Sequence, residues 1–436
     1  MSIINIIKKL YPFEYSIVGQ GNDKAIKVFK KYLPFKVFSF NSDSTLNGWK
    51  VPRAFKVIKA DLIKDNKIIL NGKLNPFSVP VHSKSYVGKI DFSRLKKHIF
   101  FSNTLKDAIP YNWTGLYKNN KSNWGFCMSK QNFLRLEKGQ YKVNIVTKNI
   151  KSKMKVLEYT LKGKSKDTII INAHNCHPYQ ANDDISGCAV GIDVLKKLNK
   201  IKNRFYTYKL LIAPELTGTI FWLNKIKNES KNIKYSILLK SVGNNNRIKL
   251  QKSYQNTTSI DLIGSNILKK KFRKFKIGKF REIYGNDETV FNSPGYNIPT
   301  ISITRYPFKE YHTNKDTPDT LNEKKLQEIK KYVLNIIYEL EKLKKNKTLK
   351  VNFKGLISLS NKKYNLYLNA KSPGIDKKKY RLIDRRWNLL MNNLPNDVNY
   401  QNLSVNEIAI KYKLPKKSVK KYINKWVSKK LLKYTN

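Results

Sequence analysis

Histidine and carboxylate side chains gather in a few short segments of this sequence. The first pair of segments is AHNCHP at residues 173–178 and ANDDISG at 181–187, the next is APELTG at 213–218, and the last is YHTNKDTPD at 311–319. Three of the five histidines of the chain fall in these segments. Imidazole and carboxylate groups together suit zinc. The pattern therefore predicts a metal site built from residues that are far apart in the sequence.

The elements around these segments predict how they could meet. Short apolar runs at 167–173, 208–213 and 300–304 predict buried strands. Apolar residues at helical spacing predict helices at 186–198 and 323–343. Strands that alternate with helices indicate an α/β fold, in which a sheet lies between helices and ligands bind at the carboxyl ends of the strands.

Each segment also has a purely structural interpretation. A histidine beside a strand can be a hydrogen-bonded core residue, and Asp183–Asp184 ahead of a helix can serve as an N-cap. A Pro-Glu pair after a strand is common in loops. We interpret His82 and His98, which lie outside the segments, as structural residues. Taken together, the segments favour a metal site.

Two further regions differ from the α/β pattern. Residues 47–120 alternate apolar and polar side chains between turns, which indicates a β-rich unit. Near the C-terminus, a capping box at 404–407 opens a short helix, and a second helix runs to about residue 426, as in a winged helix-turn-helix. We predict four domains: the N-terminal helical part of the core at 1–40, an inserted β-rich domain at 41–120, the α/β core at 121–350 and a winged helix-like domain at 351–436.

The charge of the chain is extreme but evenly spread. The 436 residues include 87 Lys and Arg against 30 Asp and Glu, which gives a formal net charge of +57. Of the basic residues 76 are lysine and only 11 are arginine, the residue suited to bidentate contacts with phosphates and bases. We therefore interpret the charge as a compositional bias and expect no nucleic-acid partner. The lysine-rich second C-terminal helix would fit contact with DNA phosphates, but protein packing or dimerisation explains it at least as well. A homo-oligomer therefore stays open.

The cysteine content and the hydropathy of the chain indicate the cellular compartment in which the protein lies. Three cysteines, Cys127, Cys176 and Cys188, cannot form a disulfide framework, which indicates a reducing environment. No stretch of 18 apolar residues occurs, and the N-terminus lacks an uninterrupted apolar segment. We expect a cytoplasmic protein with no membrane partner.

The order of these motifs resembles the zinc aminopeptidase superfamily, which also contains glutaminyl cyclases. More closely, the chain resembles bacterial aminopeptidase-like proteins of unknown function that are associated with polysaccharide biosynthesis. Motifs at 15–21, 49–52, 77–81, 124–127 and 293–295 carry this closer resemblance, which covers nearly the whole chain. It implies a three-layer α/β/α zinc-peptidase-like core, an inserted β domain and a C-terminal winged helix.

The resemblance also implies roles for individual residues. His174 and His312 would be metal ligands, and Asp183 would be a ligand shared between two metals where two are bound. Glu215 would be the general base or a further ligand, and His177 is an alternative ligand.

Other residues would lie behind the ligands or contact the substrate. Asp184 would accept hydrogen bonds beside Asp183, and Cys176 replaces an orienting aspartate, as a supporting group or a small filler. Asp287 and Glu288 could bind the free amino terminus of a substrate, or could cap helices and pair with lysines. Arg305 could hold a substrate carboxylate or a surface partner.

The chain departs from the superfamily pattern at two positions. Pro214 stands where one of two adjacent glutamates is expected, and the strand that ends near Ser241 lacks the aspartate that would hold a second metal. We therefore expect one zinc ion rather than two.

These features lead to a functional expectation with two alternatives. We expect a zinc-dependent amide or peptide hydrolase, in which metal-activated water attacks the carbonyl of a small peptide or of an acylated or aminoacylated metabolite. One alternative is a one-zinc acyl transferase or cyclase. The other, which the missing glutamate favours, is a catalytically degenerate metal- or ligand-binding protein of polysaccharide biosynthesis.

Overall fold

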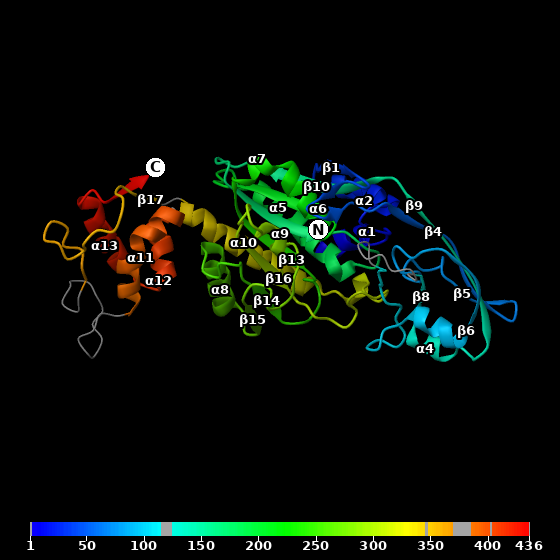
Figure 1. Ribbon diagram of the computed structural model, residues 1–436. Coiled ribbons are helices and arrows are strands. Elements are labelled where there is room, and N and C mark those ends of the chain that lie inside the picture. The colour runs from blue at the N-terminus through cyan, green and yellow to red at the C-terminus, as the bar shows by residue number, and fades with distance from the viewer. Residues whose placement is uncertain (1, 115–123, 345–347, 369–384, 402, 436) are drawn as a thin grey trace. The chain divides into compact units, whose positions relative to one another are not determined.

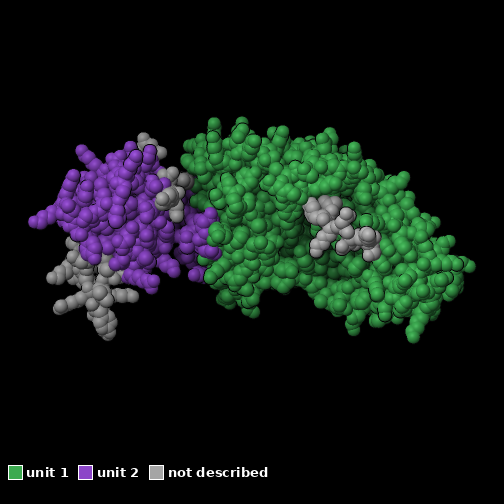
Figure 2. Space-filling view, viewed as in Figure 1, with its two compact units in different colours: residues 1–254, 273–333 green, residues 255–272, 334–436 purple. Residues whose placement is uncertain are grey.

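The computed structural model describes residues 2–114, 124–344, 348–368, 385–401 and 403–435 (Figure 1). The chain forms two compact units, which Figure 2 shows in different colours. The first consists of Met1–Tyr254 and Arg273–Val333, and the second of Gln255–Phe272 and Leu334–Asn436. None of the helices within the described residues combines the length and the apolar character that a membrane crossing needs.

An eight-stranded sheet forms the centre of the first unit. In spatial order its strands are β1 (Lys36–Asn41), β10 (Lys153–Leu161), β12 (Thr207–Ala213), β11 (Thr168–His174), β13 (Ile233–Lys240), β16 (Thr300–Thr304), β14 (Ile248–Gln251) and β15 (Phe275–Gly278). The four middle strands, β12, β11, β13 and β16, run parallel. They are buried along almost their whole length, as expected for strands covered on both faces. Their carboxyl ends therefore meet at one edge of the sheet.

Helices cover both faces of this sheet. The helices of this unit are α1 (Ile3–Leu10), α2 (Gln20–Tyr32), α3 (Phe92–Leu95), α4 (Lys130–Leu134), α5 (Ser186–Asn199), α6 (Thr217–Lys225), α7 (Lys227–Ser230) and α9 (Glu288–Phe291). Helix α5 crosses the sheet at Gly191, where a Cβ would lie 2.6 Å from Leu210 Cδ1. Trp222 of α6 clusters with Leu211. Since neighbouring strand residues point to opposite faces, α5 and α6 lie on opposite sides. The predicted α/β class with three layers is confirmed.

A second, antiparallel sheet belongs to the same unit. Its strands are ordered β5 (Lys67–Asn71), β4 (Ala54–Lys64), β9 (Gln140–Ile150) and β6 (Tyr86–Asp91). Leu62, Val143 and Ile145 lie in its buried core. Shorter pairs are β2 (Thr45–Leu46) with β3 (Trp49–Lys50), and β7 (Ile99–Phe100) with β8 (Phe126–Cys127). Strand β9 lies beyond the boundary expected at residue 120, and the four domain ranges stay predictions.

The second unit contains α8 (Ser259–Lys271), α11 (Arg385–Gln401), α12 (Val405–Tyr412), α13 (Lys416–Ser428) and the antiparallel pair β17 (Thr348–Val351) and β18 (Leu432–Thr435). Helix α10 (Glu323–Lys344) begins in the first unit and ends in the second. The capping box predicted at Ser404 and Glu407 is present at the start of α12. Trp387 and Trp426 are buried in the core of this unit. Its interpretation as a winged helix stays a prediction.

Candidate metal centre

Three ligand-type side chains meet at the carboxyl edge of the parallel strands. His177 follows β11, Asp183 precedes α5, and His312 lies in the loop after β16. His177 Nε2 lies 3.5 Å from Asp183 Oδ2, and His312 Nε2 lies 3.3 Å from the same oxygen. One ligand atom from each residue lies within 4.8 Å of the other two. The three residues are therefore close enough to hold one ion between them.

The chemistry of these side chains fits zinc. Asp183 Oδ2 is buried, and no donor among the described residues hydrogen-bonds to it, which is costly for an anionic oxygen that no cation accompanies. His177 Nδ1 lies 2.8 Å from the carbonyl oxygen of Pro178. When Nδ1 carries the hydrogen and donates it there, Nε2 keeps the lone pair that a metal needs. Burial lowers the pKa of His312, which favours the neutral, ligating form.

A neighbouring loop fixes the direction of Asp183. The carboxylate of Asp316 accepts hydrogen bonds from the backbone N–H groups of Asn182 (2.7 Å) and Asp183 (2.9 Å). Asn182 Oδ1 in turn accepts from the N–H of Gly243 at 2.8 Å. The peptide bond between Asp183 and Asp184 is cis. The segments 181–187 and 311–319 thus interlock through Asp316, a positioning residue that lies inside a predicted motif but was not assigned a role.

The segment at residues 109–111 supports both His177 and His312. The N–H of Tyr111 donates to the carbonyl of His312 at 2.7 Å, and the N–H of Ile109 donates to Asn314 Oδ1 at 2.8 Å. The Tyr111 ring stacks on His177 with centroids 4.9 Å apart and meets His312 edge-on at 5.4 Å. The sequence analysis missed Tyr111, because nothing distinguishes it among 26 tyrosines.

A buried lysine binds the other oxygen of Asp183. Lys240 ends β13, is 4% exposed, and places Nζ 3.6 Å from Asp183 Oδ1 and 3.2 Å from Glu215 Oε2. Burial alone would lower the pKa of Lys240, but the carboxylates of Asp183 and Glu215 raise it well above its usual range. Burial alone would raise the pKa of Asp183, but the ammonium of Lys240 and the adjacent imidazoles of His177 and His312 hold it well below its usual range. Both groups are therefore charged.

Glu215 shares the ammonium of Lys240 with Asp183. Its Oε1 accepts a hydrogen bond from Asn286 Nδ2 at 2.7 Å, and its Oε2 pairs with Lys240. The side chain of Glu215 is 31% exposed. The structure thus brings Glu215 beside the group of His177, Asp183 and His312 but not into it.

The structure places His174 apart from the three candidate ligands. His174 Nε2 lies 3.1 Å from Asp287 Oδ2, and Nδ1 lies 3.8 Å from Asp184 Oδ2. Burial alone would lower the pKa of His174, but Asp287, Glu215 and Asp184 raise it to about 9. His174 is the last residue of β11, and its side chain points into these buried carboxylates. The alternative ligand His177, three residues further on, occupies the position beside Asp183.

Asp184 and Cys176, the two residues expected to support the ligands, are each hydrogen-bonded within the protein. Asp184 accepts hydrogen bonds from the backbone N–H groups of His174 and Ser241, each at 3.1 Å. The N–H of Cys176 donates to Gln180 Oε1 at 3.3 Å, and burial raises the pKa of the Cys176 thiol. The thiol is therefore neutral at ordinary pH.

The three residues expected to bind substrate are engaged inside the protein. Asp287 and Glu288 have no exposed surface, and Arg305 is 2% exposed. Glu288 accepts from the N–H of Asn286 at 2.9 Å, and Arg305 pairs with Glu328 at 2.8 Å. The structure does not bring these three residues together around the candidate ligands.

The sequence matches a known family and a curated relative. A family model described as "Domain of unknown function (DUF4910)" matches residues 4–343. A protein of Clostridium acetobutylicum named "Putative polysaccharide biosynthesis protein with aminopeptidase-like domain" is 30% identical over 347 residues, which cover 78% of this chain and 77% of the relative. The resemblance predicted from the motifs is confirmed.

Solved structures share the fold. A putative peptidase from Clostridium acetobutylicum superposes with a TM-score of 0.73 and 25% identity, over 99% of this chain and 96% of its own. A zinc aminopeptidase from Bacillus subtilis superposes with a TM-score of 0.58 and 14% identity, over 78% of this chain and 94% of its own. At this identity, the similarity to the second protein concerns the fold alone.

Proposed function

The chain belongs to the DUF4910 family, as its match over residues 4–343 shows, and we propose that it is a zinc-dependent amide hydrolase. Its substrates would be small peptides or acylated or aminoacylated metabolites. The observation that carries this proposal is the group of His177, Asp183 and His312, whose ligand atoms lie within 4.8 Å of one another. The aminopeptidase-like relative and the aminopeptidase fold support the same reaction class.

His177, Asp183 and His312 would hold the metal ion through two imidazole nitrogens and one carboxylate oxygen. When bound, the zinc would supply Lewis acidity that polarises an amide carbonyl and makes water acidic enough to attack near neutral pH. Asp316 and Tyr111 keep the three ligands in place through the contacts described above.

Glu215 is the residue best placed to move protons. Its carboxylate is fixed by Asn286 and Lys240 and is still partly open to a substrate. As a general base it would accept a proton from the attacking water, and as a general acid it would return this proton to the leaving amine when the C–N bond breaks. Water is consumed, and one carboxylic acid and one amine are released.

The position of Lys240 favours a centre with one zinc ion over a centre with two. Its ammonium lies 3.6 Å from Asp183 Oδ1, the oxygen that a second cation would need. A positive charge already fixed at this oxygen repels another cation. We therefore propose one zinc ion per chain.

Metal content, measured by mass spectrometry on protein purified without added metal, tests the centre. We expect about one zinc ion per chain in the wild type and its loss in His177→Ala, Asp183→Ala and His312→Ala. His98→Ala is the matched control and should keep the ion, because His98 stacks on Trp124 within the β-rich part. Absence of metal, together with no change in thermal stability when zinc is added, would refute the proposal.

A binding function without turnover is the second candidate, and the Lys240–Glu215 pair is the observation that favours it. The ammonium of Lys240 lies 3.2 Å from Glu215 Oε2 and thus occupies an oxygen that a general base would use to accept a proton. A panel of amide substrates, tested with Glu215→Gln as the inactive control, separates the two candidates. Turnover by the wild type that Glu215→Gln abolishes supports the hydrolase, whereas metal binding without any turnover supports the binding protein.

A further inference from the structure

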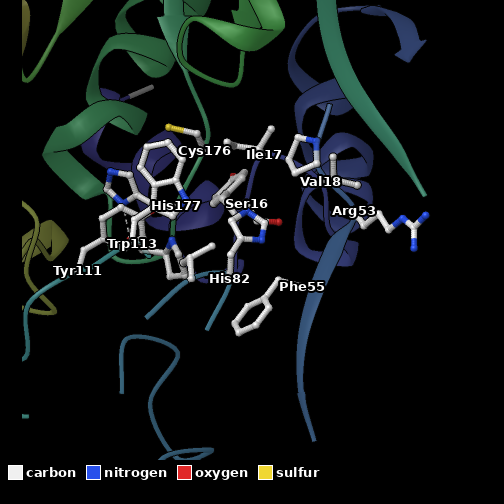
Figure 3. A pocket seen from close by; sticks show the side chains of 14 residues that line it. Ser16, Ile17, Val18, Arg53, Phe55, His82, Tyr111, Trp113, Cys176 and His177 are labelled. Carbon is white, nitrogen blue, oxygen red and sulfur yellow. Dashed lines mark hydrogen bonds between the residues drawn. The ribbon is translucent and has the colours of Figure 1, made fainter. Parts of the chain in front are cut away.

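A pocket opens beside the candidate metal centre (Figure 3). Its wall is formed by the loop between α1 and α2 at residues 15–18, by residues 52–55 at the start of β4, and by residues 81–82 before β6. Tyr111 and Trp113 come from the segment that supports His312, and residues 176–178 come from the end of β11. Segments from the N-terminus, the β-rich part and the main sheet therefore build it together.

The pocket shares one residue with the metal centre. His177 lies in its wall, while His177 Nε2 faces Asp183 Oδ2 at 3.5 Å. The His177 ring also stacks on Tyr111, a second wall residue. A molecule whose carbonyl is held at the metal centre would thus have its neighbouring group within reach of this pocket.

The lining is apolar and aromatic, and its polar groups carry no free charge. Ile17, Val18 and the rings of Phe55 and Trp113 belong to the wall. Burial lowers the pKa of His82 to about 4, so this side chain is neutral at ordinary pH.

The single cationic side chain of the pocket wall already has a partner. Arg53 Nε lies 2.7 Å from Asp43 Oδ2 in an ion pair. Asp43 also pairs with Lys50 at 3.0 Å. A charged substrate group therefore finds no unpaired charge of opposite sign among the lining residues.

The size and the lining of the pocket together determine which chemical group can bind there. The empty volume of about 480 Å³ includes open solvent, so the enclosed part suits a group no larger than a single ring or a branched alkyl chain. A sugar of similar size would need several hydrogen-bond partners, and the lining exposes little polar surface to the pocket. Aromatic walls also favour offset or edge-on contacts with a ring.

We propose that this pocket binds an uncharged aromatic or branched aliphatic group of the substrate, attached next to the carbonyl that is hydrolysed. This inference rests on the proposed function and names the substrate class within it. Ile17, Phe55 and Trp113 then determine specificity, and His177 joins the specificity pocket to the metal centre.

Two hydroxamates with the same metal-binding head test the proposal. Phenylacetohydroxamate carries a ring that acetohydroxamate lacks, and isothermal titration of the zinc-loaded protein gives the dissociation constant of each. Burial of the ring should make phenylacetohydroxamate bind about tenfold to a hundredfold more tightly. Metal-free protein should bind neither compound.

Pocket variants show whether the ring lies where we propose. Ile17→Trp should fill the pocket and Trp113→Ala should remove part of its wall, so each should abolish most of the preference for the ring. Both positions are partly exposed, so these changes are compatible with folding. Val87→Trp is the matched control: Val87 is 63% exposed on β6 and does not line the pocket, so the preference should persist.

The outcomes separate the pocket from the metal centre. Equal binding of both hydroxamates by the wild type, or an undiminished preference in Ile17→Trp and Trp113→Ala, would overturn the pocket and leave the zinc centre standing. Failure of the zinc-supplied wild type to bind either compound would overturn the zinc centre, and the pocket proposal with it.

Discussion

Replacement of Lys240 by glutamine is the sharpest test of how charge is arranged at the centre. The substitution removes a buried ammonium and keeps a side chain of similar length. Asp183 Oδ1 and Glu215 Oε2, at 3.6 Å and 3.2 Å from Nζ, lose their cationic partner at the same time. We expect a second divalent cation to take the place of the ammonium, so that the zinc content rises from about one to about two ions per chain.

The size of the effect follows from Coulomb's law. At about 4 Å and an effective dielectric constant of about 20, a unit charge and a divalent ion repel each other by about 8 kcal/mol. A second zinc ion beside Asp183 meets this repulsion in the wild type and escapes it in Lys240→Gln. Even a third of this energy weakens binding of the second ion about 100-fold.

The metal-free variant should also be less stable than the metal-free wild type. Removal of one partner from a buried ion pair costs about 3–5 kcal/mol of unfolding free energy. The partial exposure of Glu215 places the expected loss toward the lower end of this range, because water screens that carboxylate. Added zinc should restore the thermal midpoint.

Isothermal titration of metal-free protein with zinc, checked by mass spectrometry after gel filtration, measures the stoichiometry. Lys209→Gln is the matched control, because Lys209 is also buried on a central strand and pairs with Glu158 at 3.0 Å. It should lose stability and still bind one ion. A single ion per chain in Lys240→Gln would refute the reasoning that the ammonium limits the centre to one metal.

Three further predictions concern residues around the centre and in the second unit. Asp316→Asn should weaken zinc affinity about 10- to 100-fold in a competition titration. The amide can accept with only one of its two terminal atoms, so the N–H of Asn182 or of Asp183 loses its partner. Unchanged affinity would contradict a positioning role. Burial raises the pKa of Glu288 to about 7, so its folded form binds more protons than its unfolded form, and stability should fall as the pH rises from about 4.5 to 7. Chemical denaturation should show that Glu288→Gln removes up to about 3 kcal/mol of this dependence, and an unaltered pH profile would exclude Glu288 as its source. Ser404→Ala should lower the unfolding free energy of the second unit by about 1 kcal/mol in thermal denaturation, while Ser404→Asp should keep the cap.

Much of the scaffold of the centre could be predicted from local pattern. Strands β11, β12 and β16 are buried on both faces, so their sequences are short apolar runs that are easy to recognise. Helix α5 begins at Ser186, as its apolar spacing predicted, and α10 covers almost the predicted range. These elements place the histidine and carboxylate segments at the carboxyl edge of the sheet. The sequence pattern alone predicts nothing more detailed about the centre.

The details of the centre depend on directions that a sequence does not encode locally. His174 and His177 lie in the same motif, and only the turn after β11 decides which imidazole faces Asp183. Lys240 carries no distinguishing signal in a chain with 76 lysines, although it is the residue that binds two carboxylates of the centre. The burial of Arg305 depends on Glu328 in a helix that follows it, so its sequence position could not reveal its partner.

The interlocking of distant segments has a consequence for the biosynthesis of the protein. His312 and Asp316 are needed beside Asp183, so a growing chain cannot complete the ligand group until more than 300 residues have left the ribosome. Tyr111, made much earlier, can support His312 only after that moment. An ion that arrives during translation therefore meets single histidines and carboxylates, and it is retained only by a chain whose first unit has been synthesised past the last ligand. Metal uptake would then report that this unit has finished folding.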